Sequence, residues 1–283
     1  MKEFKINEDS EEVFYDAKYD TVFKNVVGCE KGKHILKAII ECALGIKLDE
    51  ITLINSELTK GSVKEQGKTT DCIVTSGNKV INVEVNRSID QGVKDRNARY
   101  IMTKHINQFR VSESYTKVIY SIQINLDWKA DYKEYKKEYM IREKSNPNDV
   151  YTDKLLIVTF NMKKLLDLWY NKDENFEYKY LAMLAIDNKE KLEKYCKGDK
   201  IMEDFKENVI DINDNDIYKD ILSKEKDNMM VIEAGLHYAK EEGIEEGIAK
   251  KTIEVAKKML EKGIDISLIS DVTGLSIEEL KKI

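Results

Sequence analysis

The sequence contains a single proline among its 283 residues, and its four cysteines and three histidines are scattered. Scarce proline, together with heavy use of Lys, Glu, Ile and Asn, favours long helices over an all-β chain punctuated by proline. No Cys-x-x-Cys pair occurs, so neither a zinc-site spacing nor a disulfide framework is indicated. The sequence also has no Gly-rich phosphate loop and no Gly-x-Ser-x-Gly elbow, which argues against the enzyme classes that depend on them.

Long hydrophobic runs are missing as well. The first ten residues lack the apolar core that a signal peptide needs. The longest apolar stretches, Ala38–Ile46 and Leu155–Phe160, fall far short of the ~20 residues that span a bilayer. With 42% hydrophobic and 35% charged residues, the chain can bury a packed core. We therefore expect a soluble, cytoplasmic protein without a membrane partner.

An excess of positive charge is also lacking. The sequence has 47 Lys and Arg against 53 Asp and Glu, a net charge of −6, which argues against nucleic-acid binding by bulk positive charge. Much of the acidity lies in two C-terminal segments, Asp211–Asp216 and Glu241–Glu246, whereas Asp90–Arg110 is basic. The composition therefore excludes bulk electrostatic binding but still allows DNA as a partner.

The hydrophobic patterning divides the chain into an α/β part and a helical part. It predicts, in order, helices at 16–27 and 31–44, strands at 51–58, 69–76 and 79–86, a helix at 90–110, and strands at 117–126 and 154–160. This order indicates a mixed sheet flanked by helices. Asn161 is a suitable N-cap for a helix over Met162–Tyr170, and the chain beyond it has a helical pattern. We predict an α/β domain over 1–160, a helical region over 161–240 and a helical tail over 241–283.

The segment from Asp71 to Asn86 carries the candidate chemistry. Gly77-Asn78 separates two β-prone runs, as in a hairpin with a two-residue loop. Counting outward from this loop, Asp71 and Glu84 become direct cross-strand neighbours, with Cβ atoms about 4.5–5.5 Å apart. Opposed like charges destabilise a hairpin, and a divalent cation held by both carboxylates would neutralise them.

Side-chain alternation gives the second strand of this hairpin one apolar and one polar face. The apolar face comprises Ile81, Val83 and Val85, and the polar face comprises Asn82, Glu84 and Asn86. A polar strand face often meets water, and a solvated carboxylate pair requires no metal. The hairpin alone therefore leaves both a metal site and a solvated face open.

The basic helix at 90–110 follows the hairpin directly. Its spacing places Arg96, Tyr100 and Lys104 near one face, and cations beside a tyrosine suit contact with a nucleic-acid backbone. The alternative is a charged helix that only solvates its outer face. The candidate nucleic-acid-binding residues are Lys94, Arg96, Arg99, Tyr100 and Lys104.

Several other short motifs stand in a definite order along the chain. They are Asp20-Thr-Val-Phe23-Lys24, Asn82-Val-Glu84-Val-Asn86, Arg96-Asn-Ala-Arg99-Tyr100 with Gln108, Gly243–Gly247 and Thr273–Glu279. Together with Asp71, they resemble the PD-(D/E)XK nuclease superfamily, and more specifically its recombination-promoting nuclease (Rpn) or PD-(D/E)XK family transposase group. The resemblance covers nearly the whole chain.

The resemblance implies a restriction-endonuclease-like PD-(D/E)XK core over residues 1–160 and a metal-dependent DNA endonuclease. Asp71 and Glu84 would hold Mg²⁺ or Mn²⁺, which would lower the pKa of the attacking water. The third catalytic position, Lys or Gln in relatives, is Asn86, which can hydrogen-bond a water but carries no positive charge. Lys94 or Lys104 from the next helix would supply a migrated lysine. Two rival functions stay open: a catalytically impaired DNA-binding relative, because of Asn86, and a helical self-association adaptor, because of the acidic tail.

The C-terminal tail has its own signals. Gly243 and Gly247 repeat with a period of four inside a helical pattern, where each glycine costs about 1 kcal/mol against alanine; this suggests a homo-oligomeric helix contact or a flexible joint. Two short helices flank Thr273-Gly274-Leu275, and Ser276–Glu279 reads as a capping box. This end is helix-turn-helix-like, but Glu278 and Glu279 would repel phosphates. We therefore favour a protein–protein or self-association module over a base-reading one.

Overall fold

The computed structural model describes residues 13–54, 72–87, 91–107, 120–171 and 176–283. These residues divide into two compact units, one that ends at Leu222 and one that begins at Ser223. The predicted domain limits at residues 160 and 240 remain predictions. In the described part of the chain, no helix combines the length and apolar composition needed to cross a membrane.

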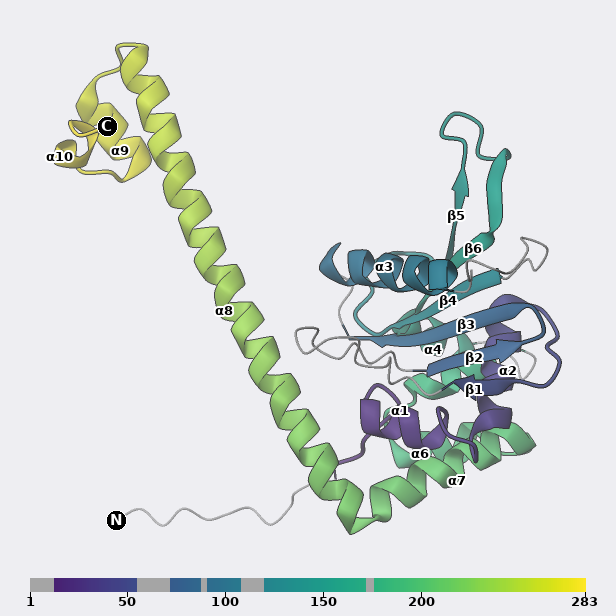
Figure 1. Cartoon of the computed structure of the whole chain (residues 1–283). Helices are drawn as coiled ribbons and strands as arrows, with labels where there is room; N and C mark the ends of the chain where they lie inside the picture. Colours follow the sequence, from purple (N-terminus) through teal and green to yellow (C-terminus); the bar gives the residue numbers. More distant parts are fainter. Residues whose placement is uncertain (1–12, 55–71, 88–90, 108–119, 172–175) are drawn as a thin grey trace, which may run out of the picture. The chain divides into compact units, whose positions relative to one another are not determined.

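The first unit is a mixed sheet with helices on both sides (Figure 1). Its strands are β1 (Thr52–Ile54), β2 (Cys72–Ser76), β3 (Lys79–Asn86), β4 (Tyr120–Asp127), β5 (Lys136–Arg142) and β6 (Val150–Asn161). Its helices are α1 (Asp20–Val26), α2 (Lys33–Leu44), α3 (Gln91–Asn107), α4 (Met162–Tyr170), α5 (Lys179–Ala182), the 3₁₀ turn η1 (Met183–Ala185), α6 (Lys189–Tyr195) and α7 (Lys200–Asp214). The expected α/β core with a mixed sheet and flanking helices is confirmed.

The six strands have the order β1-β2-β3-β4-β6-β5. The pairs β3/β4 and β4/β6 are parallel, and the other neighbours are antiparallel. Helix α3 connects the parallel strands β3 and β4, as a crossover requires. Figure 1 shows α3 over one face of the sheet and α1, α2, α4, α6 and α7 on the other side.

The β2–β3 hairpin has the predicted register. Ser76 pairs with Lys79 and Cys72 with Val83, so Gly77-Asn78 is the loop. Gly77 has φ 55, a left-handed conformation that glycine adopts without a steric penalty. Loop chemistry thus fixes which residues of β3 face α3.

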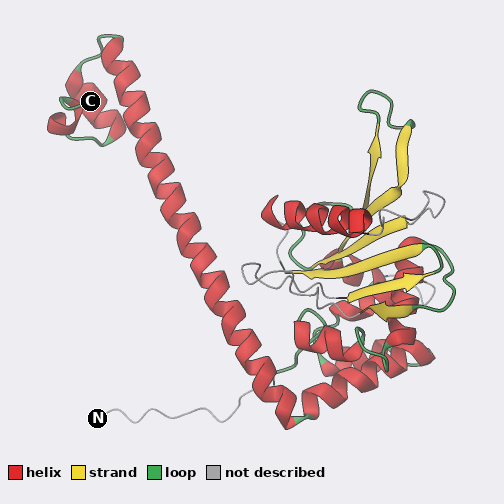
Figure 2. Cartoon of the chain, viewed as in Figure 1, coloured by secondary structure: helices red, strands yellow, loops and turns green. Residues whose placement is uncertain are grey.

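Strand β5 is absent from the pattern-based prediction. Its sequence, Lys-Lys-Glu-Tyr-Met-Ile-Arg, is mostly exposed at the edge of the sheet, and its apolar run is only three residues long. Figure 2 shows β5 and the start of β6 as a two-stranded arm beyond the rest of the sheet. Charged edge strands are common because they resist pairing with other chains, but they leave a weak sequence signal.

The N-terminal motif anchors the end of β3. Phe23 is fully buried, and Asp20 Oδ1 lies 3.7 Å from Arg87 Nη2. The Arg87 Nε atom also donates a hydrogen bond to the Lys18 carbonyl at 3.2 Å. These contacts hold the chain where β3 ends, directly after Asn86.

The second unit is helical. It contains most of α8 (Asp216–Glu261), α9 (Ile266–Thr273) and α10 (Ile277–Leu280). Gly243 and Gly247 continue the helix, and a Cβ added at either would meet nothing within 4 Å in the described part of the chain. A small core of Ala256, Ile269 and Leu280 joins the end of α8 to the last two helices, and the predicted capping box at Ser276–Glu279 is present.

Candidate active site

A buried polar layer lies between α3 and the sheet. On β3 it consists of Asn82, Glu84 and Asn86, which are 6%, 3% and 2% exposed. Their register partners on β4 are Gln123, Asn125 and Asp127, which are buried to the same degree. The predicted alternation of β3 is therefore correct, but its polar face is covered by α3 instead of meeting water.

Of the two predicted metal ligands, Glu84 is the one that the structure describes. Asn82 Nδ2 donates a hydrogen bond to Glu84 Oε1 at 2.8 Å. The Asn82 Oδ1 atom is buried and has no hydrogen-bond partner among the described residues. This local set of carboxylate and amide oxygens has the donor chemistry that Mg²⁺ or Mn²⁺ prefers.

The second predicted ligand, Asp71, lies outside the described residues. Within the described ranges, no group of three or more His, Cys, Asp and Glu side chains is arranged to hold a metal ion. The register of β2 with β3 ends at Cys72–Val83, one position before the predicted Asp71–Glu84 pair. The assignment of Asp71 and Glu84 as metal ligands therefore remains a prediction.

Asn86 is the centre of a hydrogen-bond network that joins three elements. Its Nδ2 donates to Asp127 Oδ1 on β4 at 3.1 Å. Its Oδ1 accepts from Arg96 Nη2 of α3 at 3.0 Å and from Asn97 Nδ2 at 3.4 Å. Because a guanidinium can only donate, this orientation of the Asn86 amide is the one that satisfies all partners.

Asp127 is a second buried carboxylate in this layer. Besides the bond from Asn86, it accepts a hydrogen bond from the Tyr132 hydroxyl at 3.0 Å. Burial raises the pKa of Asp127 to about 6, against the opposing effects of the Tyr132 and Asn86 hydrogen bonds and the charge of Lys94. Burial, followed by the charge of Asp127, raises the pKa of Tyr132 in turn.

The five candidate nucleic-acid residues of α3 occupy different positions. Arg96 contacts Asn86 and stacks on the ring of Tyr100, with its Cζ 5.9 Å from the ring centroid. Arg99 is exposed and, by helical periodicity, projects away from the face that carries buried Asn97. Lys104 is partly buried, which lowers its pKa. Thus α3 brings Arg96, and not Lys104, to Asn86, the predicted third catalytic position.

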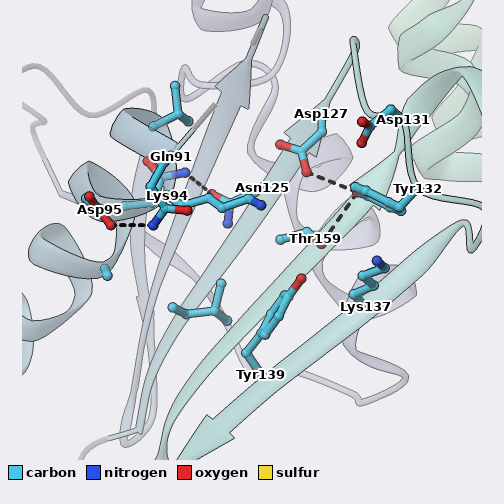
Figure 3. A pocket seen from close by; sticks show the side chains of 14 residues that line it. Gln91, Lys94, Asp95, Asn125, Asp127, Asp131, Tyr132, Lys137, Tyr139 and Thr159 are labelled. Atoms are coloured by element: carbon cyan, nitrogen blue, oxygen red, sulfur yellow. Dashed lines mark hydrogen bonds between the residues drawn. The ribbon is translucent and has the colours of Figure 1, made fainter. Parts of the chain in front are cut away.

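A cavity of about 420 Å³ opens beside the polar layer. Figure 3 shows Lys94 and Asp95 of α3 along one wall, Lys137 and Tyr139 of β5 along another, and Asp127 and Tyr132 at one end. Lys94 therefore lines the cavity and does not contact Asn86 in the manner of Arg96. The cavity and the network share Asn97, Asn125 and Asp127.

Sequence reasoning missed the contribution of β4. The run Tyr120–Asp127 alternates strictly, with Ser121, Gln123, Asn125 and Asp127 on one face and tyrosine, isoleucine or leucine on the other. The same alternation that assigned the polar face of β3 would have found these residues. Asn97 and Tyr132 had no comparable signal, because their roles depend on how α3 and the segment after β4 pack.

The geometry defines a class of protein: a mixed α/β core with a buried polar face on its hairpin strand, covered by a basic helix. A family model described as PD-(D/E)XK nuclease family transposase matches residues 17–235. The chain belongs to this family. A second model, the C-terminal HTH domain of the Rpn/YhgA-like nuclease family, matches residues 249–283, which shows that the helix-turn-helix-like end is a family domain. No curated protein and no solved structure matches the chain.

Proposed function

We propose that this chain is a divalent-metal-dependent DNA endonuclease of the Rpn type. The family match supports a nuclease-type function for the α/β core. The observation that carries the proposal is the buried Glu84, which shares one strand face with Asn82 and Asn86. A buried carboxylate needs hydrogen-bond donors or a cation to offset its desolvation, and a divalent metal ion beside Glu84 would add to the compensation that the Asn82 hydrogen bond supplies.

In the proposed enzyme, Asp71 and Glu84 hold Mg²⁺ or Mn²⁺. When bound, the ion polarises the scissile phosphate and lowers the pKa of the attacking water. Asn86 is fixed by Asp127 on one side and by Arg96 and Asn97 on the other. Its amide has one N–H left to orient that water.

Arg96 supplies the positive charge that Asn86 lacks. Its guanidinium is 3.0 Å from Asn86 Oδ1, so it stands beside the third catalytic position on a neighbouring element. A fixed cation there would stabilise charge that develops on the phosphate. This proposal replaces the expected migrated lysine, Lys94 or Lys104, with an arginine.

The test is plasmid cleavage by purified protein with Mg²⁺ or Mn²⁺, beside Asp71→Asn and Glu84→Gln. Removing either metal ligand is expected to reduce cleavage at least about 100-fold, while circular dichroism shows that the fold persists. Glu138→Gln, a substitution of an exposed β5 carboxylate outside the layer, is the matched control and should cleave normally. Unchanged cleavage by Asp71→Asn and Glu84→Gln would refute the site.

A catalytically impaired DNA-binding relative is the second candidate. It is favoured by the Asn86 network, in which Asp127 and Arg96 already bind the two ends of the amide and leave only one N–H for a water. Under this reading the wild type binds DNA without cutting it, and Asn86→Gln or Asn86→Lys restores cleavage. Cleavage by the wild type that Asn86→Ala abolishes would exclude it.

DNA and a second copy of the chain are the proposed partners. Lys94, Arg96, Arg99, Tyr100 and Lys104 are proposed to contact the DNA backbone, and the cytoplasm is the proposed compartment. For self-association through α8, the open space around Gly243 and Gly247 makes Gly243→Leu with Gly247→Leu a direct test. Light scattering should show an oligomer for the wild type and a smaller species for this variant; a monomeric wild type would refute the proposal and the adaptor function with it.

A further inference from the structure

The cavity next to the polar layer is built from five separate parts of the fold. Lys94 and Asn97 come from α3, Asp127 from β4, Tyr132 from the segment between β4 and β5, Tyr139 from β5 and Ile157 from β6. Its volume of about 420 Å³ falls in the range of small-molecule sites, about 300–1,000 Å³. The space is thus large enough for one nucleoside.

One wall of the cavity carries a hydrogen-bond acceptor without a donor. Asn97 is 4% exposed, and its Nδ2 donates to Asn125 Oδ1 at 3.0 Å. Its Oδ1 has no hydrogen-bond partner anywhere in the described ranges. An unmet buried acceptor costs free energy; because Oδ1 is closed to solvent, a ligand N–H would gain this hydrogen bond once the Asn97 side chain turns toward the cavity.

The other walls suit a flat, partly apolar ligand with a charged end. The ring of Tyr139 and the side chains of Ala98 and Ile157 offer apolar surface. Tyr139 is 48% exposed, which leaves its ring accessible for stacking. Asp127 adds a second acceptor, and Lys94 and Lys137 add positive charge. A nucleobase has both a π-face and N–H donors, and its phosphate would meet the lysines.

The cavity lies one strand away from the candidate catalytic residues. Asp127 is the register partner of Asn86, and Asn125 is the partner of Glu84. Neighbouring strands are about 4.8 Å apart, a distance comparable to the axial spacing of about 3.4 Å between successive nucleotides of one strand. A nucleotide that follows a phosphate bound through a metal ion at Glu84 would therefore reach the cavity.

We propose that this cavity holds the base of an unpaired nucleotide adjacent to the scissile phosphate. A base inside a duplex cannot enter such a pocket without leaving the stack. The substrate class is therefore single-stranded DNA or duplex DNA with an unpaired nucleotide. This inference rests on the proposed function, because it assigns Glu84 to phosphate cleavage.

The test measures DNA binding by fluorescence anisotropy in EDTA, so no cleavage is needed. Three labelled oligonucleotides of equal length are compared: a single strand, a duplex with a one-nucleotide bulge, and a fully paired duplex. Tyr139→Ala should weaken binding of the single strand and the bulged duplex about tenfold, because stacking of one base contributes about 1–3 kcal/mol. Binding of the paired duplex should be unchanged.

Tyr151→Ala is the matched control, because Tyr151 lies on the same hairpin, is 86% exposed and does not line the cavity. Ala98→Trp, which fills the cavity, should reproduce the effect of Tyr139→Ala. Equal losses for all three DNAs, or no loss in either variant, would overturn the inference. Binding of deoxyguanosine monophosphate that depends on Tyr139, without a matching effect on DNA, would assign the cavity to free nucleotides and overturn it as well.

Different experimental results would refute the base pocket and the nuclease activity. Absent cleavage with Tyr139-dependent binding of unpaired DNA would refute the nuclease but keep the base pocket. Cleavage that depends on Glu84, with binding that ignores Tyr139, would keep the nuclease and refute the pocket.

Discussion

The two faces of strands β3 and β4 are buried to nearly the same degree but consist of different side chains. One face is made of Ile81, Val83, Val85, Ile122, Ile124 and Leu126, and the other of Asn82, Glu84, Asn86, Gln123, Asn125 and Asp127. Burial of the apolar face releases water from hydrocarbon and stabilises the fold. Burial of the polar face costs free energy for every group that lacks a partner. The contrast between the two faces can be measured by substitutions on each of them.

The apolar face should produce the largest loss of stability. Ile124 is fully buried, and Ile124→Ala removes its contacts and leaves a cavity. The free energy of unfolding should fall by about 2–5 kcal/mol, measured by urea denaturation. A loss below about 1 kcal/mol would mean that this face does not form the core.

The buried carboxylate of the polar face should make stability depend on pH. The pKa of Asp127 rises from 3.8 to about 6 on folding, so the folded state binds more protons than the unfolded state between these values. Stability due to this group is therefore fully present below about pH 3.8 and falls as the pH rises to about 6. The loss corresponds to about 3 kcal/mol at most.

Asp127→Asn removes this titrating carboxyl group. Its effect on the free energy of unfolding, relative to wild type, should be most favourable at pH 7.5. The difference in unfolding free energy between variant and wild type should increase from pH 4 to pH 7.5, as read from urea curves at each pH. Asp153→Asn, a change of an exposed β6 carboxylate, controls for general charge effects. Parallel pH profiles for Asp127→Asn and wild type would contradict the raised pKa.

Local patterns predicted most of the fold around this layer. The Gly77-Asn78 loop fixes the register of the β2–β3 hairpin, and Asn161 caps α4 by accepting from the Lys164 N–H at 3.0 Å. These features depend on a few neighbouring residues, so the sequence encodes them directly. Strand β5 was not predicted because its stability depends on pairing with β6 at the edge of the sheet. Such pairing requires no regular repeat of apolar residues in the sequence.

The same reasoning from local patterns could predict only part of the candidate site. Glu84 and Asn86 lie on one strand, so alternation could place them together. Arg96 and Asp127 reach Asn86 from two other elements, and their meeting depends on how α3 crosses the sheet. Charge alone suggested that Arg96 contacts DNA, and it could not reveal the hydrogen bond to Asn86.

A third prediction concerns the replacement of one polar side chain of this face by an apolar one. Gln123 is fully buried, and neither of its amide atoms has a hydrogen-bond partner among the described residues. Gln123→Met keeps a similar volume and removes an unmet amide, so the free energy of unfolding should rise by about 1–2 kcal/mol. Gln91→Met, on the exposed first turn of α3, should change little. Destabilisation by Gln123→Met would show that its amide is satisfied by water or a bound group.

The smallest effects on stability are expected for substitutions of two arginines in α3, the helix that covers the polar face. Both are exposed, but Arg96 donates a hydrogen bond to Asn86 at 3.0 Å, whereas Arg99 projects, by helical periodicity, from the outer side of the helix. Arg96→Ala should lower the free energy of unfolding by about 1 kcal/mol, because one charge-assisted hydrogen bond near the surface is lost. Arg99→Ala should stay within about 0.5 kcal/mol of wild type.

Both substitutions remove one positive charge from the same helix, so nonspecific DNA binding should weaken to the same extent and with the same change in salt dependence. Any additional loss of cleavage in Arg96→Ala then reports its contact with Asn86 and not its charge alone. Arg96→Lys sharpens this distinction: it keeps the charge but not the planar geometry that reaches Asn86 Oδ1. Cleavage by Arg96→Lys close to that of Arg96→Ala would assign the effect to that hydrogen bond, whereas wild-type cleavage would assign it to the charge.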